Sequence, residues 1–498
     1  MSLFRAPAFL CALGAVAMAV ALQISSGMFD PMALALATAT SLLAITAAVF
    51  LRGPTEAAIP LFTPATPAVT SRAGSSSARS GAAASFASTE APVQVILGAG
   101  FLHGIWCHVF LVPTFYADPR RMGGFRGLAL LSLLVGSAYL CVHLRASLQR
   151  LRLLGFLACF VAMGFIIIHL SPRPHMDVWL CQQIGADALK HGYNPYSVSY
   201  PDIYAGESLR FYGPGIVRNH RVYMYPYPPL TALLAVPSFV ALGDVRYVSL
   251  AAMAIAALAI ARLGGTNGEV AALFLLFQGR SFFLLEQGWT EPVVLAAFAV
   301  SVLILSTGSS EERVGTPKGQ GAVPARRLPQ WLALGLSMGV LAASKQYSPL
   351  LLVPLVFALP FRLRLRTAAV ALALLVATAA PFLIWDADGL VRGVVKMQFL
   401  QPLRLDSLSL LALWARLYGT PSWGTVPAFV AAAVVLAPAL RGTVTLARAC
   451  TAAAAAWLVL VLLNKQAFCN YDWLGTGLLC VAVAAHANAA RKSKEQAA

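Results

Sequence analysis

Apolar segments long enough to cross a membrane recur along most of this chain, and they restrict its fold more than any other feature. A helix needs about 20 mainly apolar residues to cross the ~30 Å hydrocarbon core of a bilayer, and we expect roughly 11 to 14 such spans here. The segments do not alternate polar and apolar residues as the lipid-facing strands of a barrel do. We therefore predict an all-α polytopic membrane protein.

The composition agrees with this fold class. Charged residues make up 11% of the chain and hydrophobic residues 59%, whereas soluble domains contain about 25% charged residues. The net charge of +17 lies mostly in short loops, as expected of cytoplasmic loops that orient a membrane protein. A soluble basic module for nucleic acid is absent from the sequence. The eight cysteines form no Cys/His metal pattern, so we assign no metal ligands and no certain cofactor; a divalent ion stays open but has no support in the sequence.

Composition also divides the chain. A segment rich in Ala, Ser, Thr and Pro cannot bury enough apolar surface to fold, so it is expected to be a disordered linker. The domains that we predict are an N-terminal two-helix membrane appendage (1–51), the Ala/Ser/Pro linker (52–92), a transmembrane bundle (93–488) with an extracytoplasmic loop (171–227), and a basic cytoplasmic tail (489–498).

An amphipathic helix is predicted in that loop. The stretch "DVWLCQQIGADALKHG" has apolar residues at positions 180, 184 and 188, and Gly192 is a typical residue to follow a helix C-terminus. We expect this helix to lie along the membrane surface, with Asp177 at its start. Asp177 is either the N-cap of the helix or a functional carboxylate, and the sequence leaves both open.

Aromatic residues and prolines follow the helix in "GYNPYSVSYPDIY" and "YMYPYPPL". Tyrosines gather at headgroup depth in many membrane proteins, so these residues could form an interfacial belt. They could equally form a cleft in which a sugar stacks. Both interpretations stay open at this point.

Ionisable residues at the ends of apolar segments are the remaining signal, because such groups are costly in a membrane and are usually functional. Lys345, Arg404 and Lys465 are expected on one side of the bundle, where three cations would favour an anionic ligand such as a phosphate. Glu291 is expected to cap the helix that starts near Pro292.

The order of the spans carries two further expectations. One of the four apolar segments between 228 and 306 must be re-entrant or surface-lying, and one basic loop between 120 and 152 must lie on the side of Asp177.

The stretches "MDVWLCQQIGADALKHGYNPYS" and "YMYPYPPLTALLAVPSFVALGDVRY" resemble the polyprenyl-phosphate-sugar-dependent glycosyltransferases of the GT-C superfamily, most of all glycosyltransferase family 87. The resemblance covers roughly residues 153–480. It implies a GT-C-like bundle that transfers a hexose, mannose in that family's mannosyltransferases, from a polyprenyl phosphate to a glycolipid or glycan acceptor, with inversion. Membrane lipids, this donor and this acceptor are the expected partners.

The resemblance also implies roles for single residues. Asp177 would be the general base, and Lys345, Arg404 and Lys465 would bind the donor phosphate. The candidate substrate contacts are His175, Asn194, Tyr196, Tyr225, Tyr227, Glu286, Gln287, Gln346, Tyr347, Gln466 and Asn470. The expected location is a bacterial inner membrane, crossed many times, with the active site on the extracytoplasmic side.

Two other classes of function remain open. A transporter or lipid flippase would use membrane charges along a substrate pathway, but the polar residues here gather at span ends and no inverted repeat is visible. The other class is a membrane scaffold without activity. The sequence does not exclude it, but the candidate base and the three cations, which a scaffold would not need, are all present.

Overall fold

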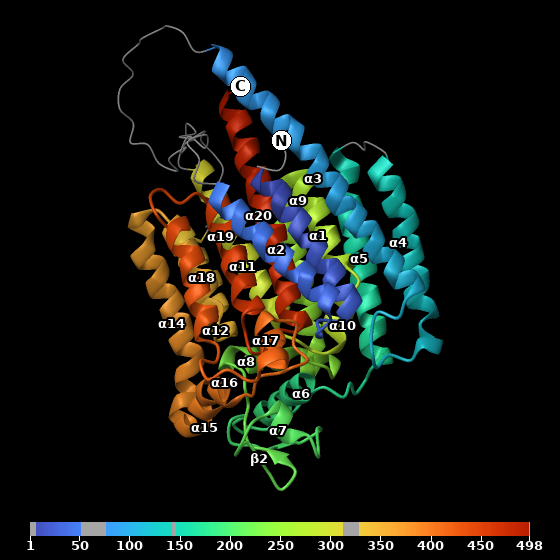
Figure 1. Ribbon diagram of the computed structural model, residues 1–498, viewed down its shortest axis with the longest axis vertical. Coiled ribbons are helices and arrows are strands. Elements are labelled where there is room, and N and C mark those ends of the chain that lie inside the picture. The colour runs from blue at the N-terminus through green and yellow to red at the C-terminus, as the bar shows by residue number, and fades with distance from the viewer. Residues whose placement is uncertain (1–5, 51–75, 142–145, 312–327, 498) are drawn as a thin grey trace, which may run out of the picture.

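The protein is described by a computed structural model at residues 6–50, 76–141, 146–311 and 328–497, and this part is almost wholly helical (Figure 1). Seven of its helices are long and apolar enough to cross a membrane. The prediction of a helical, multi-pass membrane protein is therefore confirmed. Most helices run roughly along the long axis of the molecule, and the short elements gather at one end of it.

The elements fall into two groups. The bundle contains α1 (Pro7–Ser25), α2 (Pro31–Phe50), α3 (Ser76–Phe110), α4 (Gly123–Cys141), α5 (Ala146–Leu170), α9 (Arg246–Phe277), α10 (Ser281–Glu286), α11 (Glu291–Glu311), α12 (Gln330–Ser344), α13 (Ser348–Ala358), α14 (Phe361–Trp385), α18 (Val426–Ala439), α19 (Leu446–Leu462) and α20 (Cys469–Ala497). The end group contains a 3₁₀ turn (Pro119–Arg121), α6 (Asp177–Lys190), β1 (Tyr200–Pro201), α7 (Ser208–Phe211), β2 (Val217–Arg218), β3 (Arg221–Val222), α8 (Pro229–Leu242), α15 (Ala387–Val391), a π-helical turn (Arg392–Lys396), α16 (Met397–Leu400) and α17 (Leu410–Tyr418). We call the end that carries this group the Asp177 end.

The amphipathic helix forms as predicted. It is α6, and Gly192 just beyond it has the left-handed backbone that favours glycine (φ +77°). The cap interpretation of Asp177 is wrong, because Met176 is the N-cap and Asp177 is the first helical residue. Behind α6, a three-stranded antiparallel sheet of order β1-β3-β2 and a cluster of buried tyrosines form a small second core.

The surface-lying segment that the span order required is α8. This helix packs along α6, and the carbonyl of Gly243 just after it accepts a hydrogen bond from Gln183 of α6 (2.7 Å). The next two predicted spans form a hairpin within α9, because the backbone turns at Gly265 (φ 59°, ψ −134°). As a result Arg246 at the start of α9 contacts the carbonyl of Glu286 at the end of α10 (3.3 Å).

A basic loop on the Asp177 side is also confirmed. The Tyr116 hydroxyl donates to the carbonyl of His175 (2.9 Å), so the segment that leads into Arg120 and Arg121 lies beside α6. At the opposite end, Gly265 lies next to the guanidinium of Arg491. The C-terminal end of α20 is at this opposite end in Figure 1.

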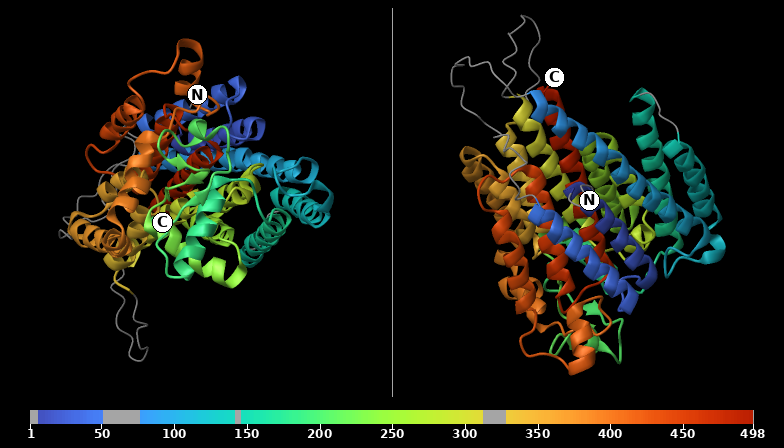
Figure 2. Two further views of the ribbon diagram at one scale, coloured as in Figure 1. Left: turned by 90° about the horizontal axis from the view of Figure 1, so that it is seen from below. Right: turned by 45° about the horizontal axis from the view of Figure 1, so that its top comes forward.

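The first two helices pack into the bundle and do not stand apart from it. Helix α1 packs on α20 and α3, and α2 packs on α1 and α19 (Figure 2). The linker prediction is wrong for residues 76–92, which belong to α3, whereas residues 52–75 lie outside the described part of the chain. Residues 489–497 of the predicted tail continue α20 as a helix.

Candidate active site

Asp177 lies where the loop after α5 enters α6, and its side chain is half-buried. One carboxylate oxygen accepts a hydrogen bond from the N–H of Val178 (2.8 Å), and the hydroxyl of Tyr204 also hydrogen-bonds to the carboxylate. Burial raises the pKa of Asp177 above its ordinary value, although these two hydrogen bonds and the charge of Arg404 act against the rise. The carboxylate therefore binds a proton more readily than an exposed aspartate does.

Several tyrosine hydroxyls lie within electrostatic range of this carboxylate. Burial raises the pKa of each hydroxyl, and the charge of Asp177 adds to the rise at Tyr116, Tyr204, Tyr212 and Tyr227. These phenols stay protonated at neutral pH and can donate hydrogen bonds to hydroxylated ligands. Sequence reasoning missed Tyr116, Tyr204 and Tyr212. The order of the spans could have identified Tyr116 from the sequence, because it places this residue on the Asp177 side of the bundle.

Arg404 lies in the loop between α16 and α17 and is held on several sides. Its guanidinium binds both oxygens of Asp406 (2.8 and 2.7 Å) and lies over the rings of Phe211 (4.2 Å) and Phe468 (4.9 Å). Arg210 also approaches Asp406 (3.4 Å). Burial acts to raise the pKa of Asp406, but the hydrogen bonds and charge of Arg404 outweigh it and lower that pKa.

Lys465 joins Arg404 through the backbone. The N–H of Arg404 donates to the carbonyl of Lys465 (3.0 Å), so the loop before α17 runs beside the loop before α20. The Lys465 ammonium donates to the carbonyls of Gln401 (2.6 Å) and Phe399 (3.3 Å) and has no carboxylate partner among the described residues. Burial lowers the pKa of Lys465. Two of the three predicted phosphate-binding cations therefore lie together.

Lys345 is separated from that pair. It lies at the break between α12 and α13 and forms a buried ion pair with Glu291 (3.1 Å), in which the side chains are 9% and 0% exposed. The Tyr347 hydroxyl donates to the same Glu291 oxygen (3.0 Å). The predicted helix cap at Glu291 is wrong, because this carboxylate binds Lys345 and Tyr347 and is the first residue of α11.

Tyr227 connects the two places. Its ring lies under the ammonium of Lys345 (5.0 Å), and the charges of both Asp177 and Glu291 act on its hydroxyl. Tyr227 comes from the second Tyr-Pro stretch of the sequence. A predicted substrate contact therefore separates the candidate base from the buried ion pair.

Three other predicted contacts support the loop and offer almost no surface to a ligand. Asn194 accepts from the N–H of Tyr196 (3.0 Å), and the Tyr196 hydroxyl donates to the carbonyl of Tyr227 (2.6 Å). Tyr225 has no exposed surface, and its ring packs edge-on against Tyr196 (5.3 Å between centroids). The Tyr-Pro cluster is thus neither a simple interfacial belt nor an open stacking cleft at these positions.

Glu286 is an anchor for a distant loop. Its carboxylate accepts three backbone N–H bonds, from Phe115 (2.7 Å), Tyr116 (2.9 Å) and Ala117 (2.8 Å), and the side chain is fully buried. These bonds leave it no free surface for the substrate contact that the resemblance implies for it. They place the 115–117 segment, and with it Tyr116, over the start of α6.

The remaining predicted contacts are amides and one histidine. Gln287 donates to Glu286 (3.2 Å), Gln346 to the carbonyl of Pro226 (2.9 Å) and Gln466 to the carbonyl of Pro402 (3.5 Å). Asn470 is buried in the first turn of α20. The His175 side chain is exposed, and its ring lies edge-on to Tyr204 (6.1 Å), so it borders the site around Asp177.

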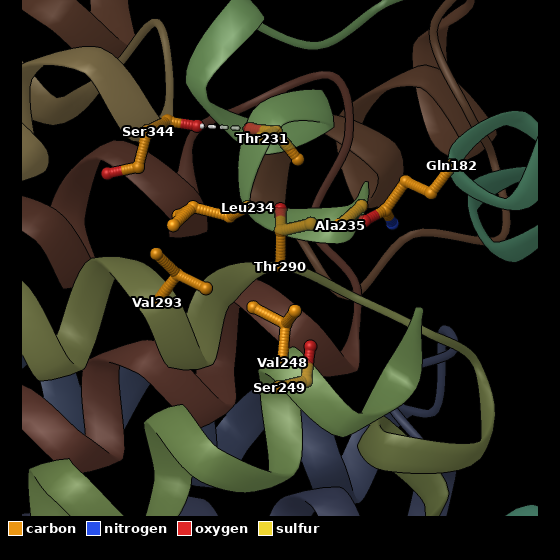
Figure 3. A pocket seen from close by; sticks show the side chains of 9 residues that line it. All are labelled: Gln182, Thr231, Leu234, Ala235, Val248, Ser249, Thr290, Val293 and Ser344. Carbon is orange, nitrogen blue, oxygen red and sulfur yellow. Dashed lines mark hydrogen bonds between the residues drawn. The ribbon is translucent and has the colours of Figure 1, made fainter. Parts of the chain in front are cut away.

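A small cavity lies on the inner side of α6, between α8, α9, α11 and α12 (Figure 3). Gln182, Thr231, Ser249 and Thr290 line it together with apolar side chains, and Thr231 donates to the carbonyl of Ser344 (3.2 Å). Its volume of ≈ 10 Å³ holds about one water molecule. The cavity is too small for a sugar, so the Asp177 surface is the better candidate for a substrate.

Known proteins give no further guidance. Comparison of the chain with protein-family models, with curated proteins and with solved structures found no match. Within the described residues, no three His, Cys, Asp or Glu side chains are placed to bind a metal ion together. The functional argument rests on the geometry around Asp177.

Proposed function

We propose that this protein is an integral membrane glycosyltransferase that moves a hexose such as mannose from a polyprenyl phosphate to a hydroxyl of a glycolipid or glycan. The observation that carries the proposal is the neighbourhood of Asp177, a half-buried carboxylate with a raised pKa that lies within range of the Arg404 charge and of several tyrosine hydroxyls. The reaction requires a base and a cation that stabilises the leaving phosphate, and this neighbourhood contains candidates for both.

The chemistry follows from these positions. Asp177 takes the proton of the acceptor hydroxyl as its oxygen bonds to the anomeric carbon. The bond between that carbon and the phosphate oxygen breaks, and the electron pair leaves with the polyprenyl phosphate. Arg404 and Lys465 stabilise the negative charge that grows on this leaving group. A single displacement of this kind inverts the anomeric centre.

The position of the site in the membrane supports a lipid-linked donor. Large aromatic side chains are exposed at the Asp177 end, among them Trp385, Trp414, Tyr418 and Trp423. Such residues mark the interface between lipid and water. The Arg-rich segments at 361–366 and 441–448 lie at the ends of their helices that are away from the Asp177 end. By the positive-inside rule this distribution supports an Asp177 end outside the cell.

The test is sugar transfer by membranes that contain this protein, supplied with radiolabelled polyprenyl-phosphate sugars. Asp177→Asn keeps the shape of the side chain and removes the base, so we expect transfer to fall by about 10²–10⁴-fold at equal protein abundance. Asp187→Asn is the matched control, because Asp187 lies on the same helix but is half exposed and paired with His191.

Each outcome decides something. Full activity in Asp177→Asn would remove Asp177 as the base. Loss of activity in both variants would point to a general effect of changes in α6. If the unchanged protein moves the donor lipid across the bilayer and transfers no sugar, the transporter interpretation replaces the transferase.

A further inference from the structure

The tip of the N-terminal hairpin, residues 26–30 between α1 and α2, contacts the loop that carries Arg404. The N–H of Phe29 donates to the carbonyl of Asp406 (2.8 Å), and Met28 pairs with Ser407 as an isolated antiparallel bridge. Most of the chain lies between these two segments in the sequence. The first two helices therefore reach the candidate phosphate site directly.

The Phe29 side chain makes a second contact with the same loop. Its ring lies under the guanidinium of Arg416 (4.0 Å), and the Nε of Arg416 donates to the carbonyl of Leu405 (2.9 Å). Phe29 therefore holds two neighbouring carbonyls of the loop. Its backbone N–H binds the carbonyl of Asp406, and its ring contacts Arg416, which binds the carbonyl of Leu405.

The hairpin is itself firmly held. Gly27 has a left-handed backbone (φ +76°), and a methyl group there would lie 2.1 Å from the backbone nitrogen of Cys469. Only glycine fits this close approach. Helix α1 packs along α20, so the tip lies against the N-terminal end of α20, close in sequence to Lys465.

We propose that the N-terminal hairpin is a positioning element for Arg404. Phe29 fixes the backbone of residues 405 and 406, and the Asp406 carboxylate then holds the Arg404 guanidinium through two hydrogen bonds. The hairpin tip thereby sets where Arg404 meets a lipid phosphate. The phosphate role of Arg404 rests on the proposed function, whereas the positioning itself does not.

The contact is tested first without any ligand. Met28→Cys and Ser407→Cys are introduced together, with a protease site placed between residues 52 and 75. Bridge partners lie close enough for a disulfide, so after oxidation and cleavage we expect the N-terminal fragment to stay attached until a reductant releases it. Each single cysteine variant is the control. Release without reductant would overturn the placement of the hairpin tip.

Positioning is tested by the mobility of the loop. A nitroxide label on Leu405→Cys, a residue that is 47% exposed, should become more mobile when Phe29→Ala is added. Met32→Ala is the matched control, because Met32 belongs to the same hairpin and is 66% exposed. Phe29→Tyr keeps the ring and should keep the label immobile. Equal mobility in Phe29→Ala and the unchanged protein would overturn the proposal.

The link to Arg404 is tested by a double-mutant cycle that measures binding of a short-chain polyprenyl phosphate to the purified protein. Phe29→Ala should weaken binding roughly tenfold, and Arg404→Gln should weaken it more. In the double variant, the loss should equal that of Arg404→Gln alone, because the hairpin acts through this guanidinium. Losses that multiply would show that Phe29 does not act through Arg404.

The two proposals fail in different ways. If the unchanged protein does not bind the lipid phosphate, the proposed donor is wrong. The mobility of the label on residue 405 then still tests whether the hairpin positions the loop. If binding is present and Phe29→Ala leaves both label mobility and binding unchanged, only the positioning role falls.

Discussion

The sequence groups three cations as candidates for binding phosphate, but the structure gives them contrasting surroundings. Lys345 lies apart from the pair Arg404–Lys465. Lys345 is buried inside the bundle and neutralised by Glu291, itself fully buried. Arg404 and Lys465 lie in adjoining loops at the Asp177 end, where the Lys465 ammonium binds backbone carbonyls and has no carboxylate partner among the described residues. A cation neutralised by a buried carboxylate serves the fold, whereas a cation bound by carbonyls keeps a net charge that is available to a ligand.

The comparison gives the two regions separate duties. The Lys345–Glu291 pair joins the break between α12 and α13 to the start of α11, and the Lys345 ammonium also packs on the ring of Tyr227. In the second region Arg404 and Arg210 share the carboxylate of Asp406, and Lys465 lies in the adjoining loop. We therefore expect changes in the first region to act on stability and changes in the second to act on activity.

The largest expected effect breaks the buried pair. Glu291→Gln leaves the Lys345 charge buried without a carboxylate, so the free energy of unfolding should fall by about 3–5 kcal/mol. Reversible unfolding in detergent, followed by tryptophan fluorescence, measures it. Glu90→Gln is the control, because Glu90 forms an exposed pair with Lys494 (side chains 43% and 47% exposed) and should cost less than about 1 kcal/mol. Equal stability of the two variants would remove the contrast between the regions.

The next effect is on activity alone. Arg404→Gln removes one charged donor from the leaving phosphate, so sugar transfer should fall about 10²–10³-fold. The melting temperature should fall less than in Glu291→Gln, because Asp406 keeps Arg210 as a cationic partner (3.4 Å). Arg221→Gln, at the same end in β3 with Ser199 as its partner, is the control and should keep its activity. A large stability loss in Arg404→Gln would place Arg404 in the same class as Lys345.

The pH dependence of sugar transfer tests the role of the Lys465 ammonium in this comparison. Burial lowers the pKa of this ammonium, so its charge is lost at a lower pH than that of an ordinary lysine. Transfer should be supported below this pKa and should decline as the pH rises through it. Lys465→Arg stays charged, so the alkaline decline should move to higher pH. An alkaline limb that stays in place would assign the decline to another group.

The sequence predicts the local structure around the site well and the distant contacts poorly. The amphipathic spacing and Gly192 locate α6, because periodicity and left-handed glycine are local signals. They do not locate the N-cap to a single residue, and Met176 takes the place expected of Asp177.

The partners of Glu286 show what the sequence cannot supply. A carboxylate at the end of an apolar segment is a sound functional candidate, but its three backbone donors lie about 170 residues earlier in the chain. No spacing or composition links the two segments. The contact between Phe29 and Asp406 is hidden for the same reason, since the first two helices look like a separate appendage until the bundle is assembled.

The smallest expected effect concerns Asp177 itself. The Tyr204 hydroxyl lowers the pKa of Asp177 by hydrogen-bonding to its charged form, so Tyr204→Phe should raise that pKa further. The base must be ionised to act, so the acid limb of the rate profile should move to higher pH, with little change at the optimum. Phenylalanine keeps the stacking on Phe211 (3.8 Å between centroids), and Tyr193→Phe, 64% exposed, is the control. A limb that moves to lower pH would mean that Tyr204 hydrogen-bonds to the neutral form and that the Val178 N–H and the Arg404 charge keep Asp177 ionised.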